Sequence, residues 1–227
     1  MAENNKLTYM VAIVGILLFV VLAGAFLYFW NNLPTSATSI DAYTISVTGL
    51  DDYQGLIGDV IIVPLPVHNE IEVFSDNDLQ YKKFGNWTSV LVVTKDGKML
   101  GFQTNSSNLS DIHARFYKSS NNAGIYTPDD KILMPAINNS GPLYTSRVSN
   151  SGNVKNYTTR GYISDTIRPA NPAANGVTFD VTFLHTEGIS PGKTGKNYHA
   201  EIHDAIPVNI SGPVPVNAQV WITGDAQ

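Results

Sequence analysis

The segment His199-Ala-Glu201-Ile-His203 places three potential metal ligands at every second position. On a β-strand these positions project from one face, so two imidazoles and a carboxylate would lie side by side. Such ligands suit zinc or another transition metal, and His185 on a facing strand is a candidate for the fourth ligand. A polar outer face of an exposed strand explains the same pattern without a metal. The sequence therefore predicts a candidate metal site, with a solvated strand face as the alternative.

Other sequence signals of catalysis are missing. The chain has no cysteine, no Gly-x-Ser-x-Gly segment and no His-Glu-x-x-His segment. The Gly-rich residues 188–196 are one residue short of phosphate-loop spacing, and the paired aspartates match no calcium-loop pattern. We therefore predict a protein that is not an enzyme and carries no cofactor, while an active site dispersed over the chain stays open as an alternative.

Composition points to an exported protein. The formal net charge is −5 and only 15% of residues are charged, which gives no basic patch for nucleic acid. Without cysteine, the body must be held together by burial rather than by disulfides. Six Asn-x-Ser/Thr sequons predict a glycoprotein, and together with the lack of cysteine they favour an archaeal cell surface. The predicted glycosylation sites are Asn86, Asn105, Asn108, Asn138, Asn156 and Asn209.

A membrane segment is the strongest prediction from the sequence. Residues 7–40 contain no Asp, Glu, Lys or Arg, and residues 7–30 are almost wholly apolar. About 20 such residues in a helix span the hydrocarbon core of a bilayer. We expect a short cytoplasmic tail at residues 1–6, a single transmembrane helix at residues 7–30 in contact with membrane lipid, and a linker at residues 31–39. A cleaved secretory signal ending near Ala25 is the alternative.

The basic residues of the chain predict its orientation. Lys6 is the only basic residue before Lys82, so the short N-terminal tail is the positively charged side of the membrane segment. Positively charged flanks stay in the cytoplasm, which puts residues 40–227 outside.

Period-two alternation of apolar and polar residues predicts strands through most of the body. The segments that show it best are residues 43–48, 177–183, 198–203 and 216–223. Asp96-Gly97 predicts a tight hairpin turn that pairs residues 90–94 with 98–102. In the apolar run of residues 59–67, Pro64 and Pro66 push the end of the strand to an edge or a bulge. Residues 108–117 fit both a helical stripe and a strand face, and we expect a short helix there.

Many short strands without long helices between them favour a mostly β fold, an antiparallel β-sandwich with long loops, for residues 40–227. Residues 124–175 are rich in Asn, Ser, Pro and Gly and are either long loops or the seam between two subdomains. We predict a membrane-anchored cell-surface protein with an interaction, adhesion or envelope-scaffolding role, whose partners are envelope proteins or glycans.

Two alternatives stay open. One is a pilin-like or membrane-complex subunit that forms homo-oligomers through its N-terminal helix. The short leader resembles that of pilin precursors, but the Lys6-Leu7 junction lacks the expected Gly or Ala and no Glu follows at the fifth position. The other alternative is an extracytoplasmic metal-dependent enzyme or metal-binding protein.

Overall fold

The computed structural model describes residues 19, 21–24, 39–68, 71–95, 97–120, 132–134, 143–145, 154–187 and 197–223. The chain divides into two units, Met1–Ser36 and Ala37–Gln227, and the boundary lies within the predicted linker. We call the second unit the β-domain. Of the predicted transmembrane helix, Phe19 and residues 21–24 are described, and they are helical. The predicted tail, most of the linker and much of the predicted seam lie outside the described residues.

The β-domain is mostly β, as predicted, and its strands follow one another with only two short helical turns among the described residues. The turns are η1 (Leu50–Asp52) and α2 (Asp76–Leu79). The strands are β1 (Ser39–Thr48), β2 (Tyr53–Gln54), β3 (Val60–Val63), β4 (Leu65–His68), β5 (Ile71–Glu72), β6 (Lys83–Phe84), β7 (Trp87–Thr94), β8 (Gly97–Thr104), β9 (Ile112–Ser120), β10 (Leu133–Met134), β11 (Leu143–Thr145), β12 (Val154–Ile163), β13 (Arg168–Pro169), β14 (Val177–Thr186), β15 (Asn197–Ile206) and β16 (Gly212–Thr223).

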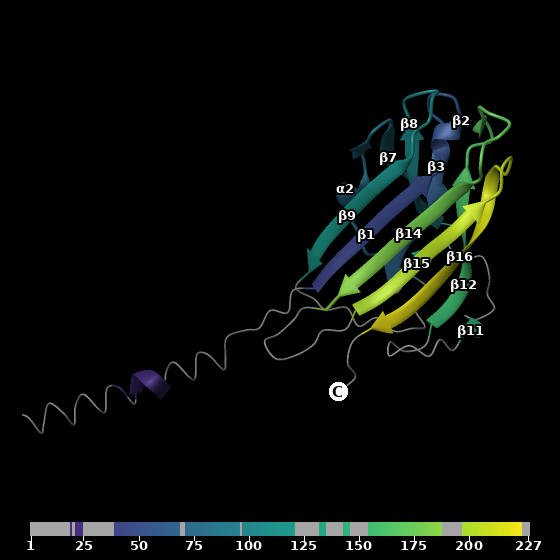
Figure 1. Cartoon of the computed structure of the whole chain (residues 1–227). Helices are drawn as coiled ribbons and strands as arrows, with labels where there is room; N and C mark the ends of the chain where they lie inside the picture. Colours follow the sequence, from purple (N-terminus) through teal and green to yellow (C-terminus); the bar gives the residue numbers. More distant parts are fainter. Residues whose placement is uncertain are drawn as a thin grey trace, which may run out of the picture. The chain divides into compact units, whose positions relative to one another are not determined.

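One antiparallel sheet of 11 strands dominates the β-domain, in the order β6-β7-β8-β3-β12-β16-β15-β14-β1-β9, with β11 paired to β12 (Figure 1). The sheet curls until its two ends meet. The contact between them is seen in the rings of Phe84 on β6 and Phe116 on β9, which pack edge to face with centroids 5.6 Å apart. The expectation of two stacked sheets in a sandwich is therefore replaced by one nearly closed sheet around a single core. A three-stranded sheet, β10-β4-β5, adds Leu65 and Leu133 to that core.

Alternation in the sequence decides which side chains enter the core. Tyr43, Ile45 and Val47 of β1 are fully buried, while the residues between them are only half-buried. The same alternation holds on β14, on β15 up to His203, and on β16 up to Val220, as predicted. Burial of these apolar faces is the main favourable contribution to folding, at about 25 cal/mol for each Å² removed from water.

The predicted hairpin of β7 and β8 is confirmed with a shifted register. Thr94 pairs with Gly97, so Gly97 belongs to β8 and not to the loop as predicted. Gly97 has a φ of +132°, a conformation that favours glycine. Asp96 itself lies outside the described residues.

The predicted helix at residues 108–117 is wrong. β9 begins at Ile112 and pairs with β1 along its length, from Val47↔Ile112 to Ser39↔Ser120. Ile112, Ala114 and Phe116 are buried. Both periodicities fit the sequence here, and the strand forms because β1 offers an edge that needs a hydrogen-bonding partner.

Candidate functional site

The three residues of the predicted metal site share one face of β15, as expected. His199, Glu201 and His203 point to the outside of the sheet, and they alternate with the buried Tyr198, Ala200 and Ile202. Strand geometry alone produces this arrangement.

Each histidine of the strand has a neighbour of its own. The ring of His199 stacks on Trp221 with centroids 5.0 Å apart and an interplanar angle of 4°. Its Nε2 lies 3.1 Å from Thr223 Oγ1, and partial burial lowers the pKa of His199 below its ordinary value. His203 Nδ1 lies 3.9 Å from Asp180 Oδ2 across the strand pair. Within the part of the chain that the structure describes, no group of three His, Cys, Asp or Glu side chains could hold a metal ion.

His185, the candidate fourth ligand, lies on the opposite face of the sheet. It pairs with Tyr198 in the register of β14 and β15, and both side chains are buried. The outward ligands of β15 therefore cannot share an ion with His185. In the described arrangement His199, Glu201 and His203 are not grouped as metal ligands either, so a metal bound by these three alone would need their side chains to turn toward one another, and it stays a prediction.

His185 instead forms a buried pair with Asp41 of β1. The distance from His185 Nδ1 to Asp41 Oδ1 is 2.6 Å, and the two side chains are 3% and 7% exposed. A carboxylate only accepts hydrogen bonds, so the Nδ1–H of His185 donates to it. The residue opposite Asp41 on β9 is Lys118, whose Nζ donates to the carbonyl of Val73 at 2.7 Å. Asp41 is thus buried in the domain, with His185 opposite it on β14 and Lys118 opposite it on β9.

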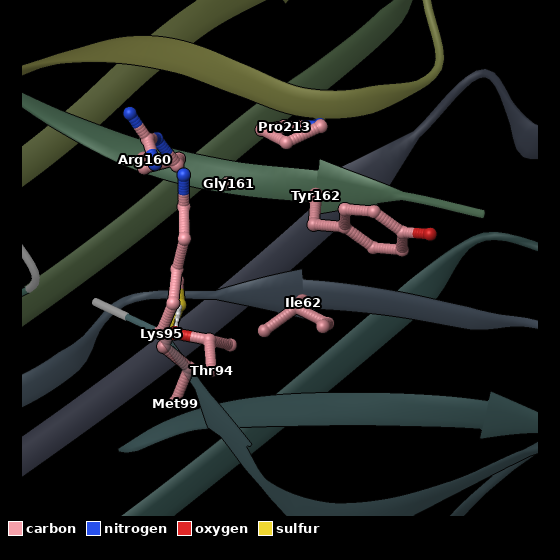
Figure 2. A pocket seen from close by; sticks show the side chains of 8 residues that line it. All are labelled: Ile62, Thr94, Lys95, Met99, Arg160, Gly161, Tyr162 and Pro213. Atoms are coloured by element: carbon pink, nitrogen blue, oxygen red, sulfur yellow. Dashed lines mark hydrogen bonds between the residues drawn. The ribbon is translucent and has the colours of Figure 1, made fainter. Parts of the chain in front are cut away.

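The described part of the sheet is interrupted beside β3, and a cavity lies there. β3 pairs with β8 and β12, but it ends at Val63, because Pro64 lacks the N–H that the ladder needs. β12 and β8 both extend past this end. In β12, Tyr162 and Ile163 pair with β3, whereas Gly161 and the residues before it do not. In β8, the pairs with β3 stop at Leu100. Thr94 and Lys95, at the end of β7, line the cavity from the other side (Figure 2).

The cavity has a volume of about 220 Å³. Its apolar wall combines Ile62, Met99 and Pro213 with the ring of Tyr162 (Figure 2). Two cationic side chains, Lys95 and Arg160, lie together at one end, away from Tyr162 (Figure 2). Thr94 and Gly161 complete the described lining.

Gly161 allows the backbone of β12 to approach the core closely. A Cβ atom on Gly161 would lie 2.6 Å from Cε2 of Phe179, whose ring is fully buried. The close approach of backbone to ring requires glycine at this position of β12.

The predicted glycosylation sites differ in their surroundings. Asn105, Asn108 and Asn209 are exposed in loops, and Asn86 is half-buried in the turn before β7. Asn156 lies within β12 and pairs with strands on both sides, opposite Leu143 and Gln219. Asn138 lies outside the described residues. Exposed loops suit glycan attachment, so Asn105, Asn108 and Asn209 are the best placed of the six.

No family model, curated protein or solved structure matches this chain.

Sequence reasoning missed both the buried pair of Asp41 and His185 and the cavity beside β3. Asp41 and His185 are 144 positions apart, and no local pattern links them. The cavity had one signal in the sequence, because Pro64 and Pro66 mark the end of the apolar run that forms β3. Nothing in the sequence indicated that Lys95 and Arg160 would meet at that opening.

Proposed function

We propose that this protein is anchored in a membrane by residues 7–30 and that its β-domain lies outside the cell, where it binds envelope proteins or glycans. The observation that carries the proposal is the absence of any charged residue from residues 7–40 in a chain that is otherwise polar. A segment of that length and composition is stable in hydrocarbon, because a helix satisfies all of its own backbone groups.

The described residues of this segment support the proposal in one respect. Phe19, Val21 and Leu22 are helical, and their side chains are 72%, 66% and 60% exposed. Apolar side chains of this size are stabilised when lipid or a partner helix covers them. Among the described residues, no helix is both long and apolar enough to cross a membrane.

The proposed binding role rests on the surface of the β-domain. Its described surface presents strand faces rich in hydroxyl and amide groups, and the sequence contains no catalytic motif. An interaction or scaffolding role fits such a surface better than catalysis does. The predicted archaeal envelope fits the sequons and the lack of cysteine.

Extraction of membranes at alkaline pH tests the anchor. The native chain should stay in the membrane pellet in carbonate and in high salt, and detergent should release it. Replacement of Phe19 and Leu22 by Arg should shift the chain to the supernatant, because each Arg near the centre of a helix costs about 2.5–3.5 kcal/mol of insertion free energy. The matched control replaces Phe19 by Leu and Leu22 by Ile, and it should behave as the native chain. Release of the native chain by carbonate would refute the anchor.

The intact mass of the protein isolated from membranes separates the anchor from its alternatives. A full-length N-terminus supports the simple anchor. Loss of about 25 residues indicates a cleaved secretory signal, since such signals span about 15–30 residues. Loss of a leader ending at Lys6 indicates the pilin-like alternative, in which the apolar helix packs against copies of itself.

A further inference from the structure

We propose that N-linked glycans on Asn105 and Asn108 lie over the exposed apolar side chains of Leu56 and Ile57 and shield them from water. This role rests on the proposed export of the β-domain, because Asn-x-Ser/Thr segments are modified in exported chains. It gives the predicted glycans a physical task at one defined place on the domain.

Leu56 and Ile57, which we call the apolar tip, end the loop between β2 and β3. Their side chains are 62% and 74% exposed. The loop is fixed in this form, because the Leu56 N–H donates to Asp59 Oδ2 at 2.7 Å and the Asp59 N–H donates to the Leu56 carbonyl at 3.0 Å. Two adjacent aliphatic side chains are therefore held at the surface. A group that covers them gains about 25 cal/mol for each Å² of apolar surface removed from water.

The loop between β8 and β9 lies directly against the apolar tip, at the same end of the sheet (Figure 1). The Gly55 N–H donates to the Ser107 carbonyl at 3.0 Å, and the Gly58 N–H donates to the Thr104 carbonyl at 2.9 Å. Both ends of the tip are therefore hydrogen-bonded to one short segment, residues 104–107. A group attached to this segment lies beside the apolar side chains.

Two sequons begin in or next to that segment, at Asn105 and Asn108, and both asparagines are exposed. Asn105 follows Thr104 directly, so its Cα lies about 3.8 Å from that of a residue bonded to the apolar tip. Asn108 forms a β-bridge with Gln54, two residues before the tip. A pyranose ring has an apolar face of C–H groups and a rim of hydroxyls. It can cover aliphatic side chains while its hydroxyls stay in water.

A second loop shows the same arrangement. Asn209 begins a sequon between β15 and β16, and the next residue, Ile210, is 43% exposed. The Ile210 N–H donates to the carbonyl of Pro207 at 3.4 Å, which ties Ile210 to the turn. An exposed aliphatic side chain thus again lies beside an exposed sequon.

Hydroxyl-radical footprinting of the full chain in isolated native membranes, read by mass spectrometry, tests the shielding. These radicals oxidise aliphatic side chains that solvent reaches. In the double variant Asn105→Gln/Asn108→Gln, oxidation of Leu56 and Ile57 should rise about twofold or more, because no sugar excludes solvent from them. Val93 is the control. It is 83% exposed near the hairpin end of β7, away from these sequons, and its oxidation should stay the same.

A second variant removes the same glycans without altering either asparagine. Ser107→Ala/Ser110→Ala breaks both sequons and should raise oxidation of the apolar tip equally, which separates the loss of sugar from a local effect of the Asn→Gln changes. Asn209→Gln should raise oxidation of Ile210 in the same way.

Two results would overturn the proposal. One is that Asn105 and Asn108 are both unmodified in the native protein. The other is equal oxidation of the apolar tip in native and variant chains, which would indicate a free surface or a protein partner. Neither result bears on the anchor, which carbonate extraction tests. Release by carbonate of a chain whose tip is shielded would refute the anchor alone.

Discussion

Replacement of His185 by Leu should destabilise the β-domain by about 3–5 kcal/mol, because it leaves the Asp41 carboxylate buried without its partner. The pair is only 3% and 7% exposed and is joined at 2.6 Å, so water cannot replace the lost hydrogen bond. The magnitude is that of breaking a buried pair on one side, which exceeds the net contribution of the hydrogen bond itself, about 1.5–3 kcal/mol for a charged group.

The chain offers a matched control on the other face of the same strand pair. His203 lies 3.9 Å from Asp180, but these side chains are 74% and 52% exposed. His203→Leu should therefore change the free energy of unfolding by no more than about 0.5 kcal/mol. The comparison keeps the residue types and changes the burial and the separation of the two side chains.

Urea unfolding at pH 7, followed by tryptophan fluorescence, measures these effects. The double variant Asp41→Leu/His185→Leu should recover at least about 2 kcal/mol relative to His185→Leu, because apolar side chains can replace a buried pair without leaving a charge behind. Equal losses for His185→Leu and His203→Leu, or additive losses in the double variant, would refute the assignment of Asp41 and His185 as a coupled buried pair.

Three further predictions concern packing, pH and modification. Gly161→Ala should cost about 1–3 kcal/mol in thermal or urea unfolding, since its Cβ would lie 2.6 Å from a ring carbon of Phe179, and Phe179→Leu in the same chain should recover part of the loss. Burial lowers the pKa of His199, so the unfolded chain takes up a proton more readily than the folded chain does. The free energy of unfolding should therefore fall as pH drops below about 6.5, and it should fall less steeply in His199→Phe. Parallel curves of unfolding free energy against pH for the two chains would contradict this. Mass spectrometry of native protein should find glycans on at least one sequon, most readily on the exposed ones; six unmodified sequon peptides would remove this support for an exported domain. The exposed sites are Asn105, Asn108 and Asn209.

Most of the strands could be predicted because alternation is a local property. In β1, β14, β15 and β16 every second residue along most of the strand is buried, and burial of that face favours a strand. Residues 108–117 show where this reasoning stops: two periodicities fit the sequence, and only the edge of β1, far away in sequence, makes β9 a strand.

The closure of the sheet and the candidate site depend on contacts that no local pattern contains. Phe84 and Phe116 meet because the whole sheet curls, and a sandwich has the same alternation along each strand. His199, Glu201 and His203 share a face because of strand geometry, but the neighbours of His199 and His203, Trp221 and Asp180, come from the register with β16 and β14. The cavity exists because Pro64 ends β3 between two longer strands, and the proline was visible in the sequence while the longer neighbours were not.

Protease added to intact cells tests the central claim most directly. If residues 7–30 anchor the chain with its N-terminus inside, the β-domain is outside, and protease should remove it from intact cells while a cytoplasmic control protein survives. Cleavage is expected in exposed loops of the domain, and a tag placed before Met1 should stay protected until detergent opens the membrane. A β-domain that is degraded only after detergent is added would contradict the account.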